Sequence, residues 1–230
     1  VAWCLLLGPA AWAQSELPGH LPEVQVQGPR DAAIGIADSA SEGAVERQAF
    51  RDRPKLRPGD IVEAVPGVVA TQHSGDGKAN QYFLRGFNLD HGTDFAVTVD
   101  GMPVNMPTHG HGQGYADLNF LIPDLVSGVR YRKGPYFADS GDFSLAGSAS
   151  LDYLSALDAP FIETTLGANR LRRLLAAGSR TRDDQTWLGA IELEGNDGPW
   201  DVPERLRKVN AVLRYSHGTP ARGFSLTGMA

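Results

Sequence analysis

The chain has 230 residues, of which 42% are hydrophobic, 8% aromatic and 21% charged, and its formal net charge at pH 7 is -6. These proportions indicate a folded protein with room for one or two domains, and they exclude a wholly disordered acidic chain. The 27 acidic side chains outnumber the 21 basic ones, which argues against a nucleic-acid partner. No apolar run reaches the roughly 18 residues of a transmembrane helix, which leaves membrane-spanning strands open.

Residues 1–13 resemble the end of a secretory signal peptide. The apolar stretch Val1–Leu7 is followed by Ala11-Trp12-Ala13, which fits the pattern of a cleavage site. The positive start is missing and the first residue is Val, so we expect a partial signal peptide. The alternative is a short buried helix or strand. The single cysteine, Cys4, lies in this segment, so the mature chain would have no disulfide, catalytic thiol or cysteine zinc site.

The next two zones differ in composition. Residues 14–53 are polar and contain several turn residues, so we expect a flexible N-terminal segment there. Residues 54–157 are expected to form a compact α+β domain. Its predicted elements are a short helix over 58–65, strands over 68–71 and 82–85, a hairpin of 95–99 and 102–104 around Asp100-Gly101, a helical turn within 117–125, and a strand over 129–133.

Residues 158–230 show successive segments of alternating polarity. Trp187, Ile191 and Leu193 point one way, and Glu192 and Glu194 point the other. Strands of about ten residues with one apolar and one polar face are typical of an antiparallel membrane barrel wall. The alternative is one half of a soluble sandwich. We expect five strands here, which are too few to close a barrel, so the strands would continue in further chain or pair with another molecule.

Several motifs, in this order, resemble those of a TonB-dependent outer-membrane receptor, with a plug domain followed by the first barrel strands. They are LPEVQVQG at 21–28, VPGV at 65–68, FLRGF at 83–87, VTVDGMPV at 97–104 and LIPDLVSGVRYRKGPY at 121–136. The resemblance covers nearly the whole chain after the signal peptide. It assigns residues 54–157 to the plug domain and residues 158–230 to the start of an incomplete β-barrel.

The resemblance implies TonB-dependent active transport across the Gram-negative outer membrane. Such receptors take up a scarce nutrient, usually a siderophore, another metal chelate, haem, cobalamin or a free metal. The plug gates the lipid-embedded barrel, and a periplasmic N-terminal TonB box couples it to TonB and its ExbB-ExbD motor. The expected partners are therefore TonB, outer-membrane lipid and a small extracellular ligand.

The predicted TonB box is an extended segment in which Val24 and Val26 share one face. Its unpaired backbone groups would add a strand to the partner, as the resemblance implies. The alternative is a disordered linker that alternates by chance. The residues of the predicted box are Leu21, Pro22, Glu23, Val24, Gln25, Val26, Gln27 and Gly28.

Arg85 and Lys133 occupy two positions that are usually arginines in the resembling family. There they pair with glutamates on the far barrel wall and lock the plug inside. Lys133 can neutralise one carboxylate but cannot form a bidentate pair, so the predicted lock would be looser. The alternative is that both are solvated surface charges.

A glycine-rich loop at 108–115 carries His109 and His111. Histidines at i and i+2 of an extended loop can both reach one zinc or copper ion, and His91, with Asp90 and Asp94, would complete its shell. The predicted metal ligands are His91, His109 and His111, and the predicted cargo-binding residues are His109, His111, Gln113 and Tyr115. The alternative is a polar loop, or histidines that contact an organic cargo.

Enzyme motifs are absent from the sequence. There is no H-E-x-x-H and no G-x-S-x-G, and the glycines at 110–114 do not lead from a strand into a helix. We therefore expect no enzyme and no cofactor, a metal being present only as cargo. The alternative function is a passive outer-membrane porin, or a binding protein without energy coupling.

Overall fold

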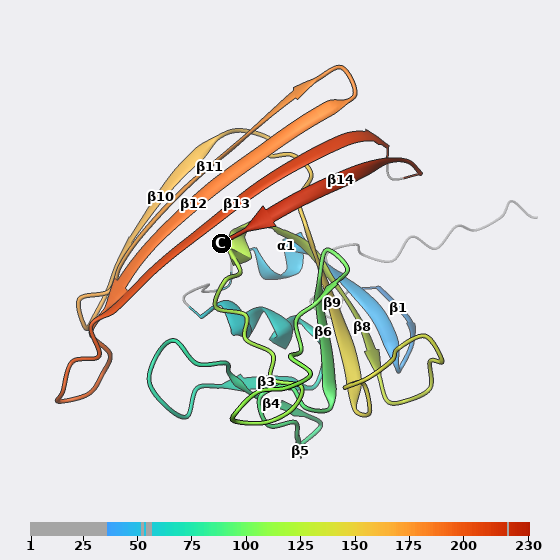
Figure 1. Cartoon of the computed structure of the whole chain (residues 1–230), viewed down its shortest axis with the longest axis vertical. Coiled ribbons are helices and arrows are strands. Elements are labelled where there is room, and N and C mark those ends of the chain that lie inside the picture. Colours follow the sequence, from blue (N-terminus) through green and yellow to red (C-terminus); the bar gives the residue numbers. More distant parts are fainter. Residues whose placement is uncertain (1–35, 52, 54–56, 220) are drawn as a thin grey trace, which may run out of the picture.

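The computed structural model describes residues 36–51, 53, 57–219 and 221–230 (Figure 1). The predicted signal peptide and TonB box lie outside these described residues. In the N-terminal domain the elements are β1 (Ile36–Ser39), β2 (Glu42–Glu46), α1 (Arg47–Phe50), η1 (Pro58–Ala64), β3 (Val68–Thr71), β4 (Gln81–Leu84), β5 (Phe87–Asn88), β6 (Phe95–Val99), β7 (Met102–Pro103), η2 (Pro123–Leu125), β8 (Val126–Lys133) and β9 (Gly147–Tyr153). The five strands that follow are β10 (Phe161–Leu166), β11 (Arg172–Arg182), β12 (Gln185–Asn196), β13 (Leu206–Thr219) and β14 (Arg222–Met229).

A mixed six-stranded sheet forms the centre of the N-terminal domain. Its strand order is β1-β2-β8-β9-β6-β7, and only the β6–β9 pair is parallel. Phe95, Val97 and Val99 of β6 are buried and alternate with half-buried residues, so one face of the sheet lies against the core. Burying such a side chain contributes on the order of 2 kcal/mol, and the neighbouring strands repeat the pattern.

Three short helical segments, α1, η1 and η2, and a small second sheet complete this domain. The segment Pro58–Ala64 is a 3-10 helix that begins with proline at its first position and buries Ile61 and Val62. The three-stranded sheet β3-β4-β5 pairs antiparallel in chain order. None of the helices among the described residues is long and apolar enough to cross a membrane.

The predicted turn at Asp100-Gly101 is confirmed. Asp100 has φ 49° and Gly101 has φ 78°, the two positive angles of a type I′ hairpin turn, and the turn joins β6 to β7.

Residues 36–50 differ from the flexible segment expected up to residue 53. β2 pairs antiparallel with β8, and Val45 lies opposite Val129. Val45 and Phe50 are buried in the common core. The polar composition of this segment concealed β2, because Val45 is the only residue of this strand that is buried.

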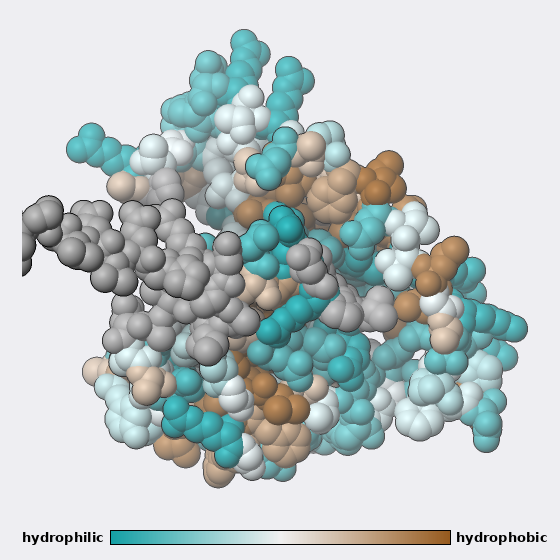
Figure 2. Space-filling view, turned by 180° about the vertical axis from the view of Figure 1, so that it is seen from behind, coloured by the Kyte–Doolittle hydropathy of each residue, from teal (hydrophilic) through white to brown (hydrophobic). Residues whose placement is uncertain are grey.

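The five strands β10 to β14 pair antiparallel in chain order and curve over one side of the N-terminal domain (Figure 1). The register places Trp187 opposite Tyr215 and Leu193 opposite Val209, so the apolar residues share one face. In Figure 2 brown apolar side chains gather over the middle of this sheet, and hydrophilic ones stand at its ends. Exposed apolar residues on this face include Ile162, Leu174, Trp187, Ile191, Leu193, Val209, Leu213 and Leu226. The predicted division into an apolar and a polar face is confirmed.

Candidate functional site

Two loops of the N-terminal domain meet around His91. One is the turn 90–94 between β5 and β6, and the other is the segment 104–116 that follows β7. The buried side chain of Asn105 joins them, because its Nδ2 donates to the carbonyl oxygens of Gly92 at 2.9 Å and Gly114 at 2.9 Å. Its Oδ1 accepts the amide hydrogen of Val97 at 2.7 Å, which ties both loops to β6.

The ring of His91 is buried and held by backbone carbonyls. Its Nδ1 lies 2.8 Å from the oxygen of Ala79 and 3.1 Å from that of Asn80. Carbonyl oxygens only accept hydrogen bonds, so Nδ1 carries the proton in neutral His91 and Nε2 keeps its lone pair.

Asp90, His91 and His111 each offer a ligand atom, and these three atoms lie within 4.8 Å of one another. Asp90 Oδ1 is 3.9 Å from His91 Nε2 and 3.8 Å from His111 Nε2. The arrangement can therefore hold a metal ion through two imidazoles and one carboxylate.

His109 lies beside this cluster in a different role. Its ring stacks on Tyr115 with ring centroids 3.9 Å apart, and its Nδ1 accepts the amide hydrogen of His111 at 3.1 Å. Tyr115 in turn accepts the amide hydrogen of Ala79 at 3.0 Å through its hydroxyl. Gln113 is exposed, and its backbone oxygen accepts the hydroxyl hydrogen of Thr93.

The structure thus gathers His91, His111 and Asp90 and leaves Asp94 out of the group. Sequence reasoning did not single out Asn105, His73 or the backbone of Ala79. The ring of His73 lies 5.0 Å from that of His91, centroid to centroid. The contacts of Asn105 join segments that only the fold brings together, so no local sequence pattern predicts these contacts.

Arg85 and Lys133 lie near each other at the ends of β4 and β8. Burial lowers the pKa of the Lys133 amine, and the positive charge of Arg85 lowers that pKa further. The Lys133 amine also stands over the ring of Tyr131, 5.1 Å from its centroid. Within the described part of the chain, no ion pair joins either cation to a carboxylate.

The polar face of the five-stranded sheet binds the N-terminal domain through buried charges. Arg173 of β11 donates to Glu192 Oε2 at 2.6 Å and to Asp124 Oδ2, on η2, at 2.5 Å. All three side chains are at least 95% buried. Asn210 of β13 donates to the backbone oxygen of Asn119 at 2.7 Å. Charged groups buried this deeply are stable only when paired, so these contacts define the docked position.

Two further groups of contacts lie toward opposite ends of this interface. Arg214 of β13 pairs with Asp100 at the β6–β7 turn. Glu204 accepts the amide hydrogen of Asp76 at 3.0 Å, and Asn196 donates to the Asp76 carboxylate at 3.0 Å. The interface therefore extends along the strands.

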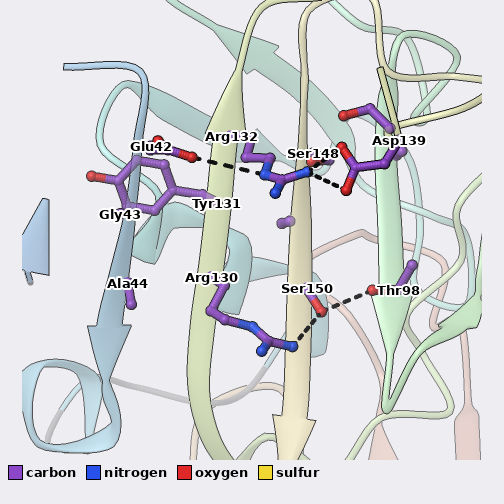
Figure 3. A pocket seen from close by; sticks show the side chains of 13 residues that line it. Glu42, Gly43, Ala44, Thr98, Arg130, Tyr131, Arg132, Asp139, Ser148 and Ser150 are labelled. Atoms are coloured by element: carbon purple, nitrogen blue, oxygen red, sulfur yellow. Dashed lines mark hydrogen bonds and ion pairs between the residues drawn. The ribbon is translucent and has the colours of Figure 1, made fainter. Parts of the chain in front are cut away.

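A polar groove of about 550 Å³ crosses the face of the six-stranded sheet that is turned away from the core (Figure 3). Arg132 donates to both oxygens of Asp139 at 2.8 and 2.9 Å, and this bond lowers the pKa of Asp139. Arg130 donates to Asp152 at 3.2 Å. Because its arginines are already paired, this groove is a weaker candidate for an anionic ligand than the histidine cluster is for a metal.

A mixed-sheet domain held on the polar inner face of an antiparallel sheet, whose other face is apolar, is the arrangement of a plugged membrane β-barrel. Residues 36–148 match the family model of the TonB-dependent receptor plug domain. The chain belongs to the TonB-dependent receptors, a family of outer-membrane transporters and not of enzymes, as its motifs predicted.

Solved receptors have the same fold. The chain is similar to the copper transporter OprC, with a TM-score of 0.62 and 15% identity over 84% of this chain and 30% of that one. It is similar to the Serratia marcescens hemophore receptor HasR, with a TM-score of 0.63 and 20% identity over 82% and 31% of the two chains. It is also similar to the Pseudomonas aeruginosa pyoverdine receptor FpvA, with a TM-score of 0.56 and 17% identity over 81% of this chain and 26% of that one. The chain thus spans less than a third of the length of these receptors.

Proposed function

We propose that this chain is the plug and first wall segment of a receptor that actively takes up a small extracellular ligand across the Gram-negative outer membrane. The observation that carries the proposal is the docking of the plug on the wall through Arg173, Glu192 and Asp124. Such buried pairing holds the plug inside the barrel, where it acts as a gate.

The strand connections support an orientation for the receptor. β11–β12 are joined by the short turn 183–184, and only two positions separate the end of β13 from the start of β14, whereas β10–β11 and β12–β13 are joined by the longer segments 167–171 and 197–205. Bacterial barrels have short periplasmic turns and longer external loops. The end that carries Glu204 is therefore external in this proposal. The opposite end, and with it the N-terminus, faces the periplasm.

The proposed coupling to TonB uses residues 21–28, with ExbB-ExbD supplying the energy. Val24 would pair through its backbone amide with a strand of TonB. Arg85 and Lys133 would complete the plug lock by pairing with carboxylates of the rest of the wall. A passive porin or a binding protein without coupling, the alternative function, needs neither a TonB box nor such a lock.

Titration of the complete purified receptor with the soluble periplasmic domain of TonB tests this function. Val24→Pro removes an amide hydrogen that a paired strand needs, so we expect it to lower the affinity for TonB by about tenfold or more. Ala32→Pro, outside the predicted box, is the matched control and is expected to bind normally. A wild-type receptor that does not bind TonB would favour the passive alternative.

A further inference from the structure

The His91 ring is prepared to bind a metal through Nε2. Metal-binding histidines usually donate their other ring nitrogen to a carbonyl or carboxylate, which fixes the tautomer and the ring orientation. The Ala79 oxygen, 2.8 Å from Nδ1, makes this contact. Asp90 Oδ1, 3.9 Å from Nε2, is beyond hydrogen-bonding distance and leaves room between the two atoms.

The side chains of Asp90 and His111 can reach an ion bound to His91 without a change of backbone conformation. Ligand atoms at zinc bond lengths of about 2.0–2.1 Å stand about 3.3 Å apart in a tetrahedron. Asp90 Oδ1 and His111 Nε2 are 3.8 Å apart, and these side chains are 47% and 48% exposed. Exposed side chains rotate easily, so closing this gap takes only small torsional changes.

The backbone beneath the cluster is fixed. Asp90 has φ 51° and Gly92 has φ 118°, so His91 lies between two residues in conformations that most residues avoid. A Cβ at Gly92 would lie 2.7 Å from the Cβ of Ala116. The hydrogen bonds of Asn105 to both loops hold this arrangement, so the ligand atoms face one another before any ion arrives.

We propose that Asp90, His91 and His111 bind a divalent transition-metal ion, Zn²⁺ or Cu²⁺, as the cargo, free or in a chelate with open coordination positions. Two imidazoles and one carboxylate favour these ions over Mg²⁺ and Ca²⁺, which prefer oxygen ligands. Three protein ligands leave the fourth position open for a chelator, for water or for the exposed imidazole of His73. An open position allows exchange, which a transported ion needs.

The cluster lies on the side of the plug that the proposed orientation makes external. Ala79, whose oxygen contacts His91, lies in the loop between β3 and β4. Asp76 of the same loop contacts Glu204 and Asn196 at the long-loop end of the wall. The role of this metal ion as cargo rests on the uptake function proposed above. The binding of the ion to Asp90, His91 and His111 does not rest on that function.

Metal titration of the complete detergent-solubilised receptor tests the site, with Zn²⁺ alone and Cu²⁺ alone as probes. We expect His111→Ala to weaken binding on the order of 100-fold and Asp90→Asn on the order of tenfold. His109→Ala removes a stacked ring and not a ligand, so it should cost less than His111→Ala. His217→Ala, on β13, is the control for adventitious histidine binding and should leave the affinity unchanged.

Electron paramagnetic resonance of the Cu²⁺ form gives a second readout that loss of folding does not mimic. We expect coupling to two imidazole nitrogens in the wild type and to one in His111→Ala. No saturable binding of either ion, or equal binding by wild type, His111→Ala and Asp90→Asn, would overturn the proposal. A receptor that binds metal at these residues but does not bind TonB would keep the site and refute the coupled uptake.

Discussion

Arg173 of β11 donates a hydrogen bond to Asp124 of η2 at 2.5 Å, although 49 positions separate them in the chain. The same guanidinium donates to Glu192 of β12. One buried cation therefore satisfies a carboxylate of the wall and a carboxylate of the plug together. Such sharing makes Arg173 the link between the buried charges of the plug and those of the wall.

Arg173→Met is expected to destabilise the complete receptor by about 3–5 kcal/mol, because it leaves two buried carboxylates without their main partner. Thermal unfolding and protease sensitivity of the plug measure the effect. Arg170→Ala is the control, since Arg170 is 86% exposed in its pair with Asp197 and should cost less than about 1 kcal/mol. Equal costs for the two variants would show that the buried cluster does not hold the plug.

Asn105→Asp tests the junction of the two loops beneath the histidine cluster. The carboxylate still accepts from Val97 but cannot donate to Gly92 and Gly114, whose carbonyl oxygens then face a negative charge. Each buried group left without its partner costs about 1–3 kcal/mol. We expect a lower unfolding temperature and faster protease cleavage within residues 105–115. Thr108→Ala, an exposed change in the same loop, serves as the comparison and should alter neither quantity.

Leu213→Arg places a charge in the middle of the exposed apolar face of the five-stranded sheet. At the bilayer midplane such a change costs about 2–4 kcal/mol, and near the interface about 0–1 kcal/mol. Gln185→Arg, beside the turn 183–184 on the same face, is the matched variant. Refolding yields of the complete receptor in lipid vesicles should fall for Leu213→Arg only. A similar yield for both variants would contradict a lipid-facing surface.

Lys133 gives a pH test of the proposed lock. In the described residues burial and Arg85 lower its pKa from 10.5, so its charge costs stability at neutral pH, and that cost fades as pH rises from the lowered pKa to 10.5. Carboxylates of the remaining wall would favour the charged amine, so they would raise the pKa of Lys133 and make its charge stabilising. We therefore expect the complete wild-type receptor to be more stable than Lys133→Met near pH 7, with the advantage lost toward pH ~11.

Unfolding midpoints of the two proteins across this pH range measure the difference. A Lys133→Met variant that is more stable than wild type near neutral pH would mean that no carboxylate reaches this amine. Lys133→Arg should add stability over the whole range if the lock exists, because arginine can form the bidentate pair.

Local patterns predicted the elements whose signal lies in consecutive residues. The strands β10 to β14 and the turn at Asp100-Gly101 followed from alternation and from turn chemistry. β9 was not predicted, because Gly147-Ser-Ala-Ser150 has small side chains and no clear apolar face. Its parallel partner β6 lies about fifty residues earlier, and no local pattern encodes such a pairing.

Only part of the candidate site was predicted, because its remaining contacts also join segments that are distant in the sequence. The sequence pointed to His109 and His111 with His91, Asp90 and Asp94, whereas the fold gathers only Asp90, His91 and His111 and stacks His109 on Tyr115. The carbonyl oxygen that contacts His91 Nδ1 belongs to Ala79, in the loop between β3 and β4, and no local pattern predicts this contact. The roles of residues 21–28, Arg85 and Lys133 remain predictions.

The contacts between plug and wall are spread along the length of the five-stranded sheet. Arg214, which pairs with Asp100, lies eight positions from Leu206, which faces Asn196 in the register, and this spacing corresponds to about 27 Å of strand. In the proposed orientation, a pull on the plug from the periplasmic end would load the Asp100 contact first and the Asp76 contacts last. The contacts would then break one after another, so the greatest force required would be that of one group of contacts and not of their sum.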